Sequence, residues 1–397
     1  MGLEGRQVVV AGGAVGGMAA ALLLARAGAS VTVLERVAEP AAVGAGLVLQ
    51  PNGLAVLAGL GLDGQLDQAG HRMGAAGTVR SASGATLARI RVPDFGAGLD
   101  HVLAIRRSRL HDLLLGAVRA AHPQVALRLG TEVTGAGGNG AVGFQAGGAA
   151  GTITGDLIVG ADGVGSVVRQ DGDFGARIRP GATYLRGLVA GDDLGLEGEW
   201  WTPLGLFGGA PMGDGTTYFY GSATRPPVAA ALAAGDLAGL RTAWAAALPL
   251  AGRVLERVQD PAELLVNQVV RVDCERWHDA RLVLVGDAAH AMAPTLGQGA
   301  NSALVDAAVL AAELAGGGPP EAALARYTAR RRPAVRRVQD TADRVARLAE
   351  LASPPLRRAR DRLLAAASGL GAERRVRAVQ QEEPSRLLEA VRRLSGR

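Results

Sequence analysis

A glycine-rich turn near the start of the chain is the first feature whose residues could do chemistry. It reads Gly12-Gly13-Ala14-Val15-Gly16-Gly17, follows a β-branched stretch at 8–11 and opens an Ala/Leu-rich segment ending at Gly28. Glycines let the backbone approach a diphosphate closely, and the N–H groups and positive end of a following helix attract it. Ala14 stands in the middle glycine position of the pattern G-x-G-x-x-G, where its methyl group adds crowding.

An acidic residue completes this motif. Glu35 ends the next β-branched stretch, 18 residues after Gly17. Its carboxylate can accept hydrogen bonds from ribose hydroxyls and would repel a 2′-phosphate, so NADP is not expected at this turn. We therefore predict a dinucleotide site made by Gly12, Ala14, Val15, Gly17 and Glu35. The motif alone does not separate NAD from FAD, and ordinary βαβ packing is the alternative.

A second segment, Leu282 to Ala307, reads LVLVGDAAHAMAPTLGQGANSALVDA. Asp287 follows an apolar stretch and can bind sugar-like hydroxyls, whereas His290 is more typical of a packed side chain than of an acid or base. The glycine turn that follows opens a helix, whose N-terminus would stabilise the negative charge that a reduced flavin carries near N1 and C2=O. The residues predicted to contact the flavin here are Asp287, Gly297, Gln298, Gly299, Ala300 and Asn301.

A third segment, GDLIVGADGVGSVVRQ (155–170), carries Asp162-Gly163 after an apolar stretch, with Arg169 following. Together the three segments resemble the class A FAD-dependent monooxygenases, the para-hydroxybenzoate hydroxylase family. Shorter matches at 44–62 and 105–115 extend the resemblance, which covers about residues 5–340. The chain departs from the family pattern at Ala14, Arg109 and Val305.

The resemblance implies an enzyme that holds FAD tightly and uses NADH or NADPH as a transient co-substrate together with O₂. Reduced FAD would form a C4a-hydroperoxide and transfer one oxygen atom to an electron-rich aromatic or apolar small molecule. The presence of a single dinucleotide turn agrees with transient docking of the nicotinamide. The resemblance also implies that Arg36, Arg107, Val133 and Asp162 lie at the cofactor and Pro294 at the reacting centre.

Aromatic residues gather where this resemblance implies a substrate-binding sheet. Of the 13 Phe, Tyr and Trp residues, seven fall between 184 and 220 in an otherwise aromatic-poor chain, which suggests a lined cavity. Tyr218 and Tyr220 share one face of a strand, and a phenol hydroxyl can orient or deprotonate a substrate. We predict catalytic roles for Arg186, Tyr218, Tyr220 and Pro294, with structural sheet tyrosines as the alternative for the tyrosine pair. Cys274 is the single cysteine, and no His/Asp/Glu spacing predicts a metal.

The elements that must position these residues alternate between βαβ pieces and β-rich inserts. This order predicts an α/β fold in which a discontinuous Rossmann-type FAD-binding domain carries an inserted mixed β-sheet substrate domain and a C-terminal helical extension. We expect a hairpin at 78–92, an antiparallel meander over 125–159, a helix pair at 228–257 and a helix at 299–314. The predicted boundaries are 1–71, 100–173 and 279–318 for the FAD domain, 72–99 and 174–278 for the substrate domain, and 319–397 for the helical region.

Composition and charge narrow the class of protein. The chain has 397 residues and is 48% apolar. Its N-terminal apolar run at 18–25 is too short to span a bilayer, so we expect a cytoplasmic protein. We also expect it to be a monomer or a homodimer. Residues 321–397 hold 19 Arg against 9 Asp and Glu. No nucleic-acid recognition motif accompanies them, so we expect a solvated helical tail that docks on the acidic body. Removing residues after about 370 would then spare flavin binding, whereas loss of flavin would show that the tail closes the site.

Four functions other than hydroxylation of a phenolic ring are alternatives for such a flavin site. Epoxidation of an electron-rich alkene uses the same electrophilic oxygen. A flavin-dependent reductase or dehydrogenase of the geranylgeranyl-reductase type and a non-catalytic flavin-binding accessory protein would share the cofactor site. A flavin-dependent halogenase is disfavoured, because EWWTP (199–203) differs from the W-x-W-x-I-P pattern and the chain contains no lysine.

Overall fold

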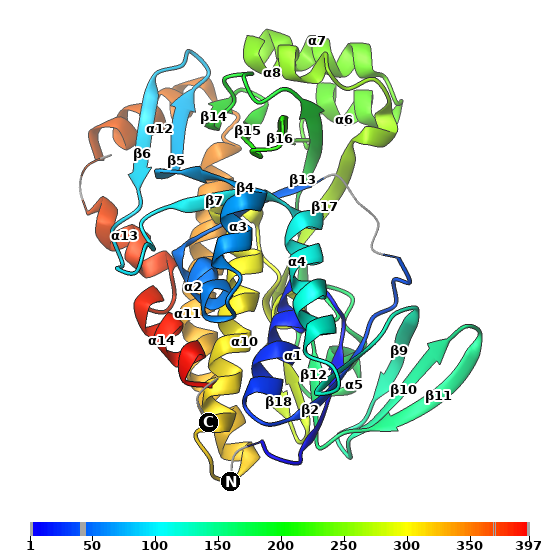
Figure 1. The fold of residues 1–397 in the computed structure, drawn as a ribbon. Helices are drawn as coiled ribbons and strands as arrows, with labels where there is room; N and C mark the ends of the chain where they lie inside the picture. Colours follow the sequence, from blue (N-terminus) through cyan, green and yellow to red (C-terminus); the bar gives the residue numbers. More distant parts are fainter. Residues whose placement is uncertain (1–2, 40–44, 368, 370, 395–397) are drawn as a thin grey trace.

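A parallel sheet built from distant stretches of the chain forms the base of the molecule (Figure 1). The computed structural model describes residues 3–39, 45–367, 369 and 371–394, so Gly44, the first residue of one predicted family match, lies outside the described residues. The sheet has the order β18-β19-β12-β1-β2-β8, and all its neighbouring strands except β18 and β19 are parallel. Its strands are β1 (Gln7–Ala11), β2 (Ser30–Leu34), β8 (Val125–Arg128), β12 (Leu157–Gly160), β18 (His278–Asp279) and β19 (Leu282–Leu284). The predicted discontinuous Rossmann-type fold is therefore confirmed.

Helices pack tightly on this sheet because its central strands are apolar on both faces. Val8, Val9 and Val10 of β1 are all buried, as expected for a parallel strand covered on both sides. The helix α1 (Val15–Arg26) packs against both α10 (Gly299–Ala315) and α4 (Arg107–Ala120). The N-termini of α1 and α10, which carry the first two sequence motifs, are brought to the same region of the fold by this packing.

A second, seven-stranded sheet is inserted above the first (Figure 1). Its order is β17-β13-β16-β15-β14-β5-β6, with all pairs antiparallel except β14 and β5, so it is mixed as predicted. Its strands are β5 (Ala75–Ser81), β6 (Thr86–Arg91), β13 (Arg177–Ala190), β14 (Gly198–Thr202), β15 (Gly205–Pro211), β16 (Thr216–Ser222) and β17 (Leu265–Asp273). The predicted hairpin at 78–92 is the β5–β6 pair.

The two faces of this sheet pack against different parts of the molecule. Trp200, Phe207 and Phe219 point to the outer face, where they pack with Trp244 under three helices. These helices are α6 (Pro226–Ala233), α7 (Leu237–Ala247) and α8 (Pro249–Leu255). The prediction of a helix pair at 228–257 is wrong in number, because a proline at position 249 cannot continue α7 and starts a new helix. The inner face is turned toward the FAD domain and carries the predicted substrate residues.

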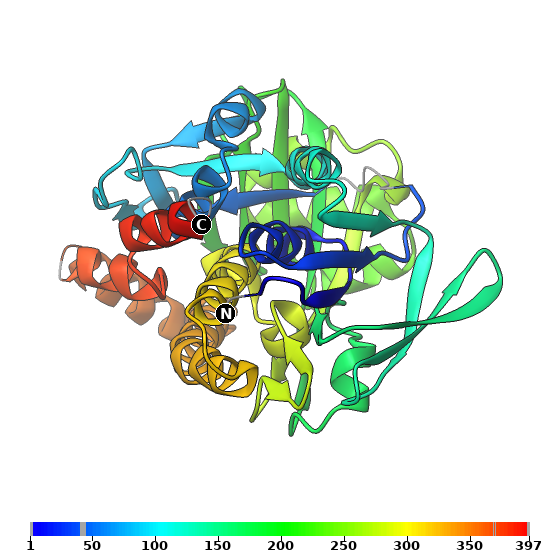
Figure 2. The same ribbon diagram turned by 60° about the horizontal axis from the view of Figure 1, so that its bottom comes forward.

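Two three-stranded sheets complete the β-structure. One consists of β9 (Thr131–Ala136), β10 (Ala141–Ala146) and β11 (Ala149–Thr154), and it projects away from the body (Figure 2). The other consists of β3 (Gly46–Leu49), β4 (Gly70–Met73) and β7 (Val102–Arg106). The predicted meander over 125–159 is therefore only partly correct. Its first and last strands, β8 and β12, join the parallel sheet instead, where β8 pairs with β2 and the fully buried β12 pairs with β1.

The C-terminal region is helical, as predicted, and part of it enters the core. A long helix, α11 (Pro320–Ala349), is followed by α12 (Pro354–Ala367), α13 (Ala372–Val379) and α14 (Pro384–Leu394). Helix α14 packs directly on α2 (Pro51–Gly59). The contact is so close that a Cβ atom added at Gly59 would lie 2.5 Å from the side chain of Val391 in α14. The remaining short helices are α3 (Asp63–Ala69), α5 (Val167–Asp171), α9 (Asp287–His290), η1 (Pro261–Glu263) and η2 (Pro294–Leu296). No helix within the described part of the chain is both long and apolar enough to cross a membrane.

Candidate active site

The glycine turn forms a cradle that larger residues would fill. Gly12 has a φ of +99°, and a Cβ there would lie 2.5 Å from the carbonyl oxygen of Ala161. A Cβ at Gly17 would lie only 1.9 Å from the carbonyl oxygen of Gly12. Ala14, in contrast, caps α1 with an ordinary extended backbone (φ −81°) and an exposed side chain. The two glycines that the turn needs sterically are therefore present, and the alanine causes no backbone strain.

Glu35 closes over this turn. Its carboxylate accepts hydrogen bonds from the backbone N–H of Gly13 at 2.6 Å and of Val37 at 2.8 Å. A Cβ at Gly13 would lie 2.9 Å from that of Glu35, so the second glycine of the turn permits this close approach. Each carboxylate oxygen keeps a further lone pair that can accept a ribose hydroxyl. The neighbouring Arg36 is exposed, and Val133 lies nearly buried on β9, the strand that follows β8.

Asp162 and Arg169 connect the middle motif to the other two. One oxygen of Asp162 accepts from the backbone N–H groups of Val167 (2.7 Å) and Val168 (3.2 Å) at the start of α5. Burial raises the pKa of Asp162, and its other oxygen, Oδ1, is buried with no hydrogen-bond partner among the described residues. Arg169 is buried and donates to the carbonyl oxygen of Ala288 at 2.8 Å, which ties this segment to α9. An unsatisfied buried acceptor beside a glycine cradle fits a bound nucleotide.

The loop between α9 and α10 presents its backbone rather than its side chains. Asp287 is exposed at the first position of α9, and Gly297 adopts a left-handed conformation (φ +61°) before α10 begins at Gly299. Asn301 is fully buried and bonds to the backbone of β3 and its flanks, donating to the carbonyl oxygen of Val48 (3.0 Å) and accepting from the N–H of Gln50 (2.9 Å). The side chain of Asn301 thus holds the loop, and the N–H groups of α10 remain for a flavin. Pro294 is exposed at the start of η2, and Ala300 lies partly buried in the first turn of α10.

We expect Asp287→Ala to lower the affinity for FAD by about tenfold to a hundredfold, since a hydrogen bond to a charged group contributes about 1.5–3 kcal/mol. Flavin content of the purified protein and FAD titration of the apoprotein measure this. Asp63→Ala is the matched control, because Asp63 is also exposed in the first turn of a helix but lies at α3. Normal flavin content in the Asp287 variant would contradict this assignment.

The three predicted substrate residues of the upper sheet share its inner face. Arg186 of β13 lies directly across from Tyr220 of β16, and the rings of Tyr218 and Tyr220 are 5.8 Å apart. Tyr218 also reaches the lower domain, where a Cβ at Gly46 of β3 would lie 2.6 Å from its ring. Burial raises the pKa of Tyr218, while the positive charges of Arg186 and Arg107 lower it. The fold therefore brings Arg107, at the start of α4, close to the tyrosines as well.

An apolar cluster surrounds these tyrosines at the junction of the two sheets. It joins β7 of the small sheet to β15 and β16 of the large one, so it spans the junction between the domains. Such a lining excludes water and suits the ring of an aromatic ligand. Its buried members are Met73, Val102, Ala104, Ala210, Met212 and Tyr218.

Sequence reasoning missed a carboxylate on the same inner face. Glu199 of β14 accepts a hydrogen bond from the indole N–H of Trp201 at 2.5 Å and from the hydroxyl of Tyr220 at 3.1 Å. Burial raises the pKa of Glu199, although both hydrogen bonds lower it. The signal in the sequence was a glutamate two residues before a tryptophan in an apolar strand, which places both on one face.

A buried ionic cluster behind the loop was also missed. Asp306 of α10 lies 2.5 Å from Nε2 of His290 and accepts from Nε of Arg331 at 2.8 Å, and all three residues are buried. Burial alone would raise the pKa of Asp306, but the charges of His290 and Arg331 lower it to about 2. Trp277 stacks on His290 at 4.9 Å. The cluster joins α9, α10 and α11, and this arrangement agrees with the prediction that His290 is a packed side chain.

The C-terminal arm, residues 371–394, reaches the same loop from the other side. Gln298 is fully buried, and its side-chain oxygen accepts from Nδ2 of Asn52 and from Nε2 of Gln381, each at 3.1 Å. Gln381 holds a left-handed backbone conformation (φ +68°) that is unusual for a residue other than glycine. Gln380 accepts from the N–H of Asn52 at 3.0 Å. The arm is therefore part of the structure that supports the loop before α10, rather than a tail on the surface.

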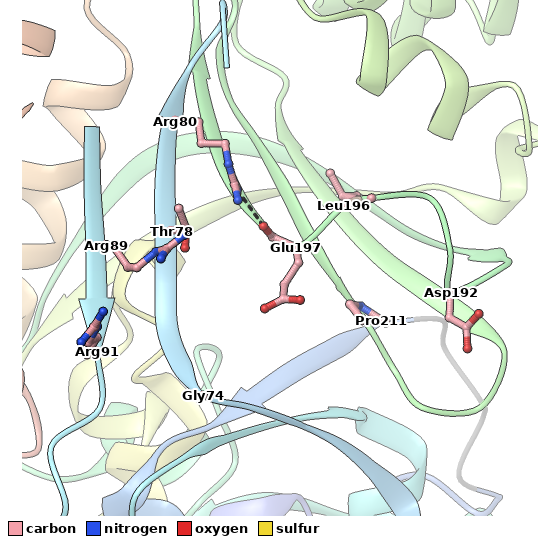
Figure 3. A pocket seen from close by; sticks show the side chains of 10 residues that line it. Gly74, Thr78, Arg80, Arg89, Arg91, Asp192, Leu196, Glu197 and Pro211 are labelled. Carbon is pink, nitrogen blue, oxygen red and sulfur yellow. Dashed lines mark hydrogen bonds between the residues drawn. The ribbon is translucent and has the colours of Figure 1, made fainter. Parts of the chain in front are cut away.

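The outer face of the upper sheet carries a separate cavity of about 450 Å³ (Figure 3). Arg80 lines it and donates to the carbonyl oxygen of Glu197 at 2.9 Å, with its guanidinium over the ring of Trp200. None of the residues that line it belongs to the predicted site. Because Arg80 covers Trp200 on the outer face, this cavity and the pair of Tyr220 and Glu199 lie on opposite faces of the sheet.

Comparison with known proteins agrees with this geometry. Residues 6–189 and 256–342 match the family model described as FAD binding domain. Aurachin C monooxygenase/isomerase of Stigmatella aurantiaca is 34% identical over 334 residues, which cover 82% of this chain and 85% of that protein. Kynurenine 3-monooxygenase of Salinispora arenicola is 33% identical over 396 residues, which cover 90% of this chain and 84% of that protein. The solved structure of tetrameric 2-methyl-3-hydroxypyridine-5-carboxylic acid oxygenase superimposes with a TM-score of 0.77 at 27% identity, covering 96% of this chain and 97% of that one.

Proposed function

The chain belongs to the FAD binding domain family, the class A flavoprotein monooxygenases, and from this premise we propose that it uses NADH or NADPH and O₂ to hydroxylate a phenolic substrate. Its relatives include proteins named for the oxygenation of small aromatic and heterocyclic compounds. The observation that carries the proposal is the placement of Arg186, Tyr218 and Tyr220 on one face of the upper sheet, where Tyr218 packs against Gly46 of β3 in the lower domain.

Each group of residues at the site has a role that follows from its chemistry. Gly12 and Gly17 would leave space for the diphosphate of FAD, Glu35 would accept hydrogen bonds from its ribose, and the N–H groups at the start of α10 would hold its flavin end. FAD, when bound and reduced by the nicotinamide, supplies the activation of O₂. Arg186 provides a positive charge that can hold an ionised substrate oxygen, and the apolar cluster around Tyr218 keeps water away from the reacting atoms.

The test of this function is oxidation of NADH and NADPH by the purified protein, with and without a panel of phenols. Stimulated consumption matched to an oxygenated product would support hydroxylation. Reduction of the substrate without O₂ would instead support the reductase alternative. Absence of turnover with either nicotinamide would favour the accessory flavoprotein.

We expect Tyr218→Phe to raise KM for the substrate by up to about tenfold and leave FAD content unchanged, since one neutral hydrogen bond contributes about 0.5–1.5 kcal/mol. Steady-state kinetics with the best phenol of the panel measures this. Tyr184→Phe is the control, because Tyr184 lies on the same face but packs with Trp201 and Leu206. Unchanged kinetics in the Tyr218 variant would show that this tyrosine has only a structural role.

A further inference from the structure

The pairing of Glu199 with Tyr220 depends on a glycine between them. Glu199 of β14 lies across from Gly208 of β15, which in turn lies across from Tyr220 of β16. A Cβ at Gly208 would come within 2.8 Å of the Tyr220 hydroxyl oxygen. Because the middle strand has no side chain here, the phenol of Tyr220 lies over it and reaches the carboxylate two strands away.

Hydrogen bonds from neutral groups hold the carboxylate of Glu199. No arginine or histidine of the described residues forms an ion pair with Glu199, so its partners are the neutral donors of Trp201 and Tyr220. Burial raises the pKa of Glu199, and burial together with the charge of Glu199 raises the pKa of Tyr220 well above its ordinary value. A negative charge in this pair therefore resides on Glu199, with Tyr220 as the neutral donor.

Other titratable and charged groups surround the pair. Arg360 of α12 lies over the ring of Trp201 at 4.9 Å and pairs with Asp361. Glu350, after α11, is hydrogen-bonded to Ser222 and its pKa is raised by burial. The groups that face the pair are thus Tyr184 and Arg186 from β13, Tyr218 from β16, Glu350, and Arg360 with Asp361 from α12.

We propose that Glu199 is the proton acceptor of the substrate site and that it receives the proton of a bound phenol through the hydroxyl of Tyr220. The inference rests on the proposed function. The substrate O–H bond breaks as an O–H bond to the Tyr220 oxygen forms, and the proton originally on Tyr220 passes to a Glu199 oxygen. The products are a substrate phenolate, a neutral Tyr220 and a neutral carboxyl, so charge is conserved and no oxidant is needed. The phenolate ring is the more electron-rich partner for an electrophilic oxygen.

The geometry also explains why Tyr220, rather than Tyr218, carries the proton. The hydroxyl of Tyr220 donates to Glu199, so its oxygen lone pairs are left to accept from a substrate. Tyr218 lies beside it, toward Gly46 and the flavin domain. Tyr218 is therefore placed to contact the substrate, and Tyr220 to pass its proton outward to Glu199.

The test measures ionisation of bound 4-nitrophenol and 4-nitrocatechol by absorbance across pH, with FAD-loaded protein and no nicotinamide. Below the probe's own pKa, the wild type is expected to show phenolate absorbance with no proton released to the solvent, because Glu199 takes the proton up. In Glu199→Gln the acceptor is absent, so phenolate absorbance should be matched by release of about one proton per phenolate, measured with an indicator dye. Tyr220→Phe keeps the ring, removes the hydroxyl and is expected to give the same proton release, and it carries the test if Glu199→Gln does not fold. Flavin content serves as the measure of folding.

Glu197→Gln is the matched control. Glu197 lies two residues earlier, is exposed, and lines the cavity on the opposite face of the sheet (Figure 3). Its variant should titrate the probe as the wild type does. Equal proton release per phenolate in wild type, Glu199→Gln and Tyr220→Phe would overturn the role of Glu199 and leave the proposed function standing. Failure of the wild type to bind either phenol would count against both.

Discussion

Replacing Asp306 with alanine is expected to lower the free energy of unfolding by about 3–5 kcal/mol, because it leaves a buried charge without its partner. Arg331 is fully buried and donates to Asp306 at 2.8 Å, and His290 loses its partner in the same change. Asp306 also accepts from the backbone N–H of Gly286 at 3.0 Å, directly before Asp287. The variant should therefore lose flavin as well as stability. Urea unfolding of the apoprotein separates the two effects.

The matched control is Glu313→Ala on the same helix. Glu313 pairs with Arg326 and Arg330 of α11, but those arginines are about half exposed, and surface ion pairs contribute only about 0–1 kcal/mol. An Asp306 variant no less stable than the Glu313 variant would contradict the importance of the cluster.

The effect of Asp306 has a defined pH dependence. The pKa of Asp306 in the folded protein, about 2, is lower than its ordinary value of about 4. A lowered pKa stabilises the fold above the ordinary value, and this contribution is lost as the pH falls toward 2. The stability difference between wild type and Asp306→Ala should therefore stay constant from neutral pH to about 4 and shrink below it. A difference that grows with acidification would show that another group dominates.

The double variant Gln380→Ala/Gln381→Ala is expected to weaken FAD binding by about tenfold or more. Gln381 donates to the side-chain oxygens of Gln298 and Ser302 and accepts from Arg331 at 2.6 Å, so its loss leaves several buried groups without partners. Each such group costs about 1–3 kcal/mol. The loop that precedes α10 then loses its support from the C-terminal arm. FAD titration of the apoprotein, monitored by flavin fluorescence, measures the change.

Glu383→Ala is the control for the arm, because Glu383 makes only a surface ion pair with Arg377. Removal of residues after 370 should have a larger effect than the double variant, since it also removes the apolar side chains by which α14 packs on α2. Of the two outcomes considered from the sequence, the structure thus favours loss of flavin. Full flavin retention by both the double variant and the truncated chain would show that the arm only docks.

The cofactor motifs could be predicted from the sequence because their function is local. The turn at Gly12–Gly17, the acid at Glu35 and the segment around Asp287 each place their groups within one strand–turn–helix unit, where spacing along the chain fixes spacing in space. The same holds for Tyr218 and Tyr220, whose shared face follows from the two-residue period of a strand. The domain boundaries and the roles of the site residues stay predictions.

Contacts between distant segments could not be predicted, since no local pattern encodes them. The strands β8 and β12 were expected to join a meander, yet both enter the parallel sheet, because an apolar strand pairs equally well with either neighbour. The polar contacts of Gln298 depend on Gln381, 83 residues away. The contact of Glu199 with Tyr220 could not be predicted either, because it depends on Gly208 in the strand between them.

The sequence by itself determined the cofactor class and the α/β frame, since both depend on short motifs and on the order of strands and helices. Tertiary structure alone decided what holds the loop before α10 in place and which carboxylate lies beside Tyr220. The physical reason is burial. Asp306, Glu199 and Gln298 derive their chemistry from removal from water beside specific partners, and only the packing of α10, α11, the C-terminal arm and the upper sheet brings those partners together.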